Sequence, residues 1–121
     1  MEKDIGKRLS RKTVNSIRAN VKFHDFCGKR YRIVWKKPTK ALAGGDAWGL
    51  CDDPDAPEKT IHISPSLKEL DFLTTCIDEA IHGCNFSLDN DHVADMSNSI
   101  GEFLWRVGFR VEEDYIWHEG S

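Results

Sequence analysis

The sequence has no long apolar run and no strong excess of either charge. No stretch approaches the ~20 apolar residues of a membrane-spanning helix, and the charged N-terminus is not followed by the apolar run of a signal peptide. Lysines and arginines number 17 against 20 aspartates and glutamates, giving a formal net charge of −3. We therefore expect a cytoplasmic protein with no membrane partner and without the overall basic charge typical of nucleic-acid binding.

Cysteine is scarce and shows no metal-binding spacing. The chain has four cysteines, and no two of them form the Cys-x-x-Cys pair of a structural zinc site. Without a secretory signal, free thiols are expected rather than disulfides. The sequence shows no internal repeat, and its 121 residues suit one domain. We expect a single domain over 1–121, with a basic N-terminal helix at 1–22 and an acidic tail at 111–121.

Positive charge is concentrated in the first 22 residues, which contain seven lysines and arginines. Apolar residues at Ile5, Leu9, Val14 and Ile17 give this segment the pattern of a short amphipathic helix on the domain surface. Such a helix could contact nucleic-acid phosphates or an acidic protein partner. A solvated helix is the simpler interpretation.

Alternating apolar residues between turn signals predict strands in the first half of the chain. Residues 21–35 are typical of a hairpin that turns near Gly28. Two further strand patterns occupy 47–51 and 60–63, with an acidic, proline-containing loop between them.

Helical spacing predicts two consecutive helices in the second half. The first starts at the possible capping box Ser66–Glu69, or at Ser64, and ends near residue 84. The second is capped by Asp89 and ends near residue 108. Strands followed by helices indicate a mixed α and β fold.

Three residues of the first helix could carry chemistry. Asp78 and His82 are four residues apart and share one helix face, and Glu79 follows Asp78 directly. Ile77 and Ile81 should face the core, which puts the pair at the margin of the packed face. Asp-Glu-x-x-His is close to the His-Glu-x-x-His motif, in which two histidines bind zinc and the glutamate activates water. On many exposed helices, the same residue types are simply solvated.

The order of elements around this helix resembles a group of short zincin-like proteins that are frequent in bacteriophage and mobile-element genomes. The strand at 59–63, the helix carrying Glu79 and His82, and a second helix ending at 104–110 follow one another as in minimal SprT-like or gluzincin metallopeptidase domains. The resemblance covers about residues 28–110. It implies an α+β, minimal zincin-like domain with an N-terminal helix, a small three-stranded sheet, an active-site helix and a second C-terminal helix.

The resemblance also implies roles for individual residues. His82 matches the second histidine ligand, and Glu79 matches the catalytic glutamate that activates a metal-bound water. The third ligand falls on Asp91, with Asp95 and His92 as alternatives.

Asp78 departs from the family pattern, which has its first histidine ligand at that position. Aspartate can bind zinc, but two carboxylates and one histidine would nearly cancel the charge of a divalent ion and weaken its activation of water. Such a site also shifts from zinc toward manganese, magnesium or calcium. Two hypotheses remain: a metal-dependent peptidase acting on a peptide or protein, or a non-catalytic zincin-fold module, such as a phage accessory protein that binds a host protein in the host cytoplasm.

Overall fold

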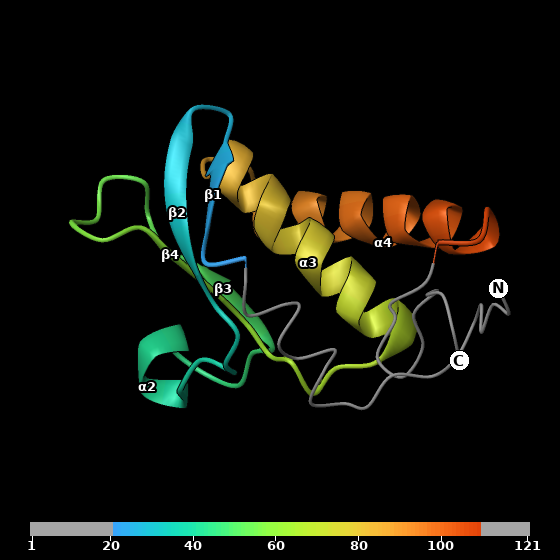
Figure 1. Ribbon diagram of the computed structural model, residues 1–121, viewed down its shortest axis with the longest axis horizontal. Helices are drawn as coiled ribbons and strands as arrows, with labels where there is room; N and C mark the ends of the chain where they lie inside the picture. The colour runs from blue at the N-terminus through green and yellow to red at the C-terminus, as the bar shows by residue number, and fades with distance from the viewer. Residues whose placement is uncertain (1–20, 110–121) are drawn as a thin grey trace, which may run out of the picture.

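A four-stranded sheet and three helices make up residues 21–109, the part of the chain that the computed structural model describes (Figure 1). In chain order the elements are β1 (Phe23–Phe26), β2 (Lys29–Val34), α2 (Lys40–Ala43), β3 (Gly49–Cys51), β4 (Thr60–Ile63), α3 (Glu69–Cys84) and α4 (Asn90–Arg106). The basic helix expected at 1–22 lies, except for its last two residues, outside the described residues, and the acidic tail at 111–121 lies wholly outside them.

A tight two-residue turn joins β1 to β2, where the sequence predicted a hairpin turn. Its central residues both have positive φ, 51° at Cys27 and 85° at Gly28, as a type I′ turn requires. Phe26 and Lys29 face each other across the two strands directly beside the turn.

The strand order is β1-β2-β4-β3, with β2 and β4 parallel and the other two pairs antiparallel. The α+β architecture is confirmed, but the expectation of a three-stranded sheet is wrong. Both arms of the hairpin are full strands, and the short β3 adds a fourth by pairing with β4. This pairing makes β3 an edge strand of the sheet.

The core lies between the sheet and α3. Alternate residues of β2 and β4 point toward the helix, as the two-residue period of a strand requires: Tyr31 and Ile33 from β2, Ile61 and Ile63 from β4. Phe72 of α3 completes this buried cluster. The cluster fixes the position of α3 over the sheet.

The other side of α3 packs against α4, and the two helices run side by side on one face of the sheet (Figure 1). At Gly101 of α4 a Cβ atom would collide with the Thr74 methyl group of α3, so the close approach requires glycine there. Ile77 and Ile81, expected in the core, are only half-buried, whereas Glu79 is buried. Burial on α3 therefore follows two contact faces instead of one apolar stripe.

The two helices begin differently. Asp89 caps α4 as predicted, with its Oδ2 accepting a hydrogen bond of 3.1 Å from the His92 amide. The expected capping box of α3 does not form: the helix begins at Glu69, and Lys68 at its cap position makes no side-chain cap bond. Ser66 instead exchanges a hydroxyl hydrogen bond of 2.9 Å with Ser64.

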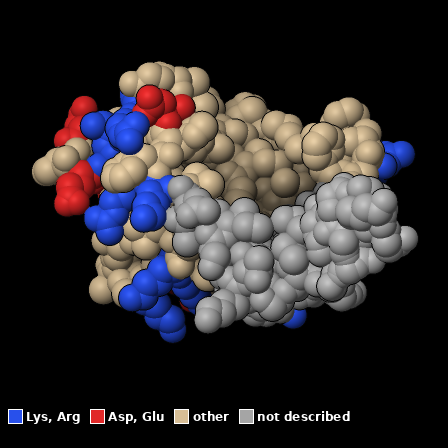
Figure 2. Space-filling view, in the orientation of Figure 1, with Lys and Arg blue, Asp and Glu red and all other residues tan. Residues whose placement is uncertain are grey.

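Charged side chains are unevenly distributed over the visible face. Figure 2 shows lysine, arginine and acidic residues gathered over the strands and their loops, while the described surface over α3 and α4 is almost free of them. No helix within residues 21–109 is both long enough and apolar enough to cross a membrane.

Candidate functional site

A cleft of about 600 Å³ lies between the edge strand β3, helix α3 and the start of α4. All three residues singled out on α3, Asp78, Glu79 and His82, line this cleft. Leu50 of β3 and Asp89 of α4 line it from the other elements. The cleft is therefore the place where the three candidate residues of α3 lie together.

Glu79 is the most deeply buried acidic residue of the described chain, with 6% of its surface exposed. Burial, assisted by the nearby negative charge of Asp78, raises the pKa of its carboxyl to about 8. The carboxyl lies directly against β3, because a Cβ atom at Gly49 would be only 2.7 Å from Glu79 Oε2. Burial therefore favours the protonated form of Glu79 at neutral pH, and its carboxyl occupies space that Gly49 leaves open.

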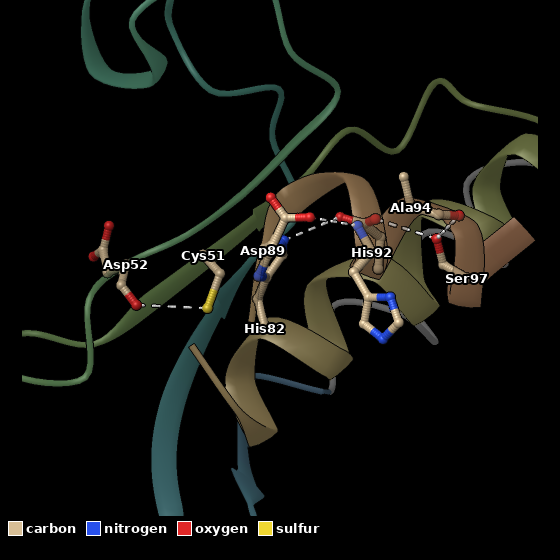
Figure 3. Close-up of polar contacts among 8 residues, drawn as sticks. Cys51, Asp52, His82, Asp89, His92, Ala94 and Ser97 are labelled. Atoms are coloured by element: carbon tan, nitrogen blue, oxygen red, sulfur yellow. Dashed lines mark hydrogen bonds and ion pairs between the residues drawn. The ribbon is translucent and has the colours of Figure 1, made fainter. Parts of the chain in front are cut away.

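Asp78 and His82 form a pair on the wall of the cleft. Asp78 Oδ2 lies 3.6 Å from His82 Nε2, and both side chains are mostly buried. The other carboxylate oxygen, Oδ1, accepts a 3.2 Å hydrogen bond from the Ser97 hydroxyl of α4. Figure 3 shows His82 and Ser97 at the two ends of this line of polar contacts. A hydrogen bond from α4 thus fixes the orientation of the Asp78 carboxylate on α3.

Sequence reasoning missed Ser97. The residue is buried, with 3% of its surface exposed, between Val93 and Gly101 on the side of α4 that packs on α3. The available signal was its spacing, since a small polar residue four positions from each of two residues on a packed face points inward. The single hydroxyl proton of Ser97 is shared between Asp78 Oδ1 and the Ala94 carbonyl, which lies 3.1 Å from the hydroxyl oxygen.

The candidates for the third ligand do not line the cleft. Asp91, His92 and Asp95 are exposed, and the part of α4 that borders the cleft is its start, at Asp89 and Asn90. Asp89 also caps the helix through the His92 amide (Figure 3). Among the acidic residues at the start of α4, the one that lines the cleft is therefore the cap residue Asp89, two positions before Asp91.

Cys51 lines the cleft but is poorly suited to act as a nucleophile. Burial raises the pKa of its thiol to about 12, and the thiol donates a 3.5 Å hydrogen bond to the Asp52 carbonyl (Figure 3). A nucleophilic cysteine needs the opposite shift, toward the thiolate at neutral pH. The chemistry of this cleft therefore depends on its carboxyl groups and His82.

The donor groups are only partly assembled for a metal. Within residues 21–109, no three histidine, cysteine, aspartate or glutamate side chains are grouped closely enough to hold an ion. Comparison with known proteins gives no assignment either, since no protein-family model, curated protein or solved structure matches this chain. The function must be argued from the cleft itself.

Proposed function

We propose that this protein is a divalent-metal-dependent hydrolase of zincin-like type that cleaves a peptide bond. One observation carries the proposal: Asp78, Glu79 and His82 line one wall of a cleft whose opposite wall is a sheet edge. A possible ligand pair, a proton-carrying carboxyl and an open strand are the parts that hydrolysis of an extended peptide requires.

The geometry of the ligand pair favours a bound ion. Asp78 Oδ2 and His82 Nε2 are 3.6 Å apart, which is long for a hydrogen bond. Two ligands at ~2.1 Å from one tetrahedral ion are themselves ~3.4 Å apart, so the pair needs little movement to share an ion. Asp89 is the best placed third ligand, because it lines the same cleft and Asp91 does not. Carboxylate-rich donors suit manganese as well as zinc.

Glu79 is proposed as the proton carrier. When bound, the ion would polarise the scissile carbonyl and lower the pKa of its water. Glu79 takes the proton of the attacking water and passes it to the leaving amine, which requires a carboxyl whose pKa lies near the working pH. Its raised pKa supports this role, and a cation beside Asp78 would lower that pKa and favour the ionised form.

The edge strand supports a peptide as the substrate. β3 pairs with β4 on one side only, and its three residues line the cleft on the other. An extended peptide can add to such an edge through main-chain hydrogen bonds. This arrangement would hold the scissile bond opposite Glu79.

Glu79→Gln separates metal binding from turnover. The variant should keep the metal and lose cleavage of a denatured protein substrate such as casein, because only the proton carrier is removed. Glu102→Gln on the exposed surface of α4 is the matched control and should cleave like the parent. Cleavage by Glu79→Gln at the parental rate would refute the mechanism.

A second candidate is a peptide-binding module without catalysis. It is favoured by the lack of a third grouped donor within residues 21–109 and by the hydrogen bond from Ser97 that occupies Asp78. Such a module would bind extended peptides equally well after Asp78→Ala and His82→Ala and would never cleave them. Loss of peptide binding in either variant would count against it.

A further inference from the structure

The tip of the β1–β2 hairpin meets the C-terminal end of α3. The ring of Phe26 packs on Gly83 so closely that a Cβ atom there would lie 3.0 Å from it. Cys27 and Cys84 directly follow these two residues, and the two thiols are close enough that Cys27 raises the pKa of the Cys84 thiol. Both are free thiols in the structure, and Cys27 is exposed to solvent. Two cysteines far apart in the sequence therefore form an accessible dithiol.

The backbone at Cys27 is unusual for a cysteine. Its φ of 51° lies in the left-handed region, which non-glycine residues seldom adopt. At this position a type I′ turn prefers asparagine, aspartate or glycine. Because Cys27 is exposed, burial of its side chain does not explain the choice. Its position beside Cys84 is a local reason for a cysteine at this strained backbone position.

We propose that Cys27 and Cys84 are a redox modification site, which reacts with a low-molecular-weight disulfide such as glutathione disulfide to form a reversible intramolecular disulfide. The exposed Cys27, as its thiolate, attacks one sulfur of glutathione disulfide, which releases one glutathione thiolate and leaves a mixed disulfide. Cys84 then loses its proton to solvent and attacks the Cys27 sulfur, which expels the second glutathione. Two protein thiols are oxidised, and one glutathione disulfide is reduced to two glutathione molecules.

The disulfide would tie the hairpin tip to the end of α3. The closed loop runs from residue 27 to residue 84 and contains β2, α2, β3, β4 and nearly all of α3, so the cross-link constrains about half of the unfolded chain. This inference stands on the two thiols alone and does not depend on the proposed hydrolase activity.

The test uses the reduced full-length chain, incubated with glutathione disulfide and then alkylated, digested and analysed by mass spectrometry. The expected product is a peptide pair linked through Cys27 and Cys84. Cys84→Ser should instead accumulate one stable glutathione adduct on Cys27, while the control Cys76→Ser should form the same link as the parent. A parent that keeps the glutathione adduct, or links Cys27 to another cysteine, would overturn the proposal.

A second measurement needs no variant. The oxidised parent should unfold at a higher urea concentration than the reduced parent, because a bond that fits the native structure constrains the unfolded chain. An equal or lower midpoint would show that the bond does not fit the native structure, and would contradict the proposal.

Discussion

Replacing Glu79 by glutamine should stabilise the metal-free protein, and by more as the pH rises. The folded protein holds the Glu79 proton up to a pKa of about 8, whereas the unfolded chain releases it near the ordinary value of 4.5. The folded state therefore binds more protons than the unfolded state between these values, and the contribution of Glu79 to stability falls as the pH rises through this window. Glutamine has nearly the same shape and no proton to lose.

The magnitude follows from the size of the shift. Each pKa unit corresponds to about 1.4 kcal/mol, so the parent should lose about 3 kcal/mol relative to Glu79→Gln between pH 4.5 and pH 7. The assay is urea unfolding of both proteins, followed by circular dichroism with a chelator present, at pH 5, 6, 7 and 8. Groups that titrate equally in both proteins cancel in the difference between them.

The control for this series is Glu102→Gln, because Glu102 is exposed. Its stability should stay within about 0.5 kcal/mol of the parent at every pH, as for other exposed substitutions. A difference between Glu79→Gln and the parent that does not grow with pH would refute the reasoning. It would show that Glu79 is already ionised in the folded protein at neutral pH.

Three further substitutions test contacts that position α3, β3 and α4. Gly49→Ala should cost roughly 1–3 kcal/mol in urea unfolding, because its methyl group would displace the Glu79 carboxyl. The cost should largely vanish in a Glu79→Ala background, and an additive loss would contradict the contact. Gly101→Ala should cost a similar amount. Thr74→Ser removes the colliding methyl group, so it should restore the lost stability in the double variant. Asp89→Ala should cost about 1 kcal/mol through the lost helix cap, whereas a loss as large for Asp89→Asn would mean that capping is not the reason.

Local sequence patterns correctly predicted features that depend on a few neighbouring residues, such as a turn or a helix cap. The turn at Gly28 and the cap at Asp89 follow from backbone requirements of a few residues, and both are present. The start of α3 was wrong, since the spacing of Ser66 and Glu69 suits a capping box that the connection from β4 does not form. The spacing of two residues does not reveal the backbone conformation of the segment that connects β4 to α3.

The candidate site was only partly predictable for a related reason. Helical spacing places Asp78 and His82 on one face, and the structure brings both into the cleft. The burial of Glu79 depends on β3, and the role of Ser97 depends on how α4 crosses α3. These contacts join segments distant in the sequence, so periodicity along one helix carries no information about them. On the same grounds, helical spacing does not show that Asp89 lines the cleft while Asp91, the predicted third ligand, is exposed outside it.

Elemental analysis tests the central claim most directly. The protein should be purified without chelator or affinity metal, alongside His82→Ala, and both should be measured before and after incubation with zinc and manganese. The account predicts about one divalent ion per parent chain, and none in the variant, because His82 supplies a ligand that the remaining carboxylates cannot replace. No metal in either protein after incubation would contradict the hydrolase proposal and favour a peptide-binding module.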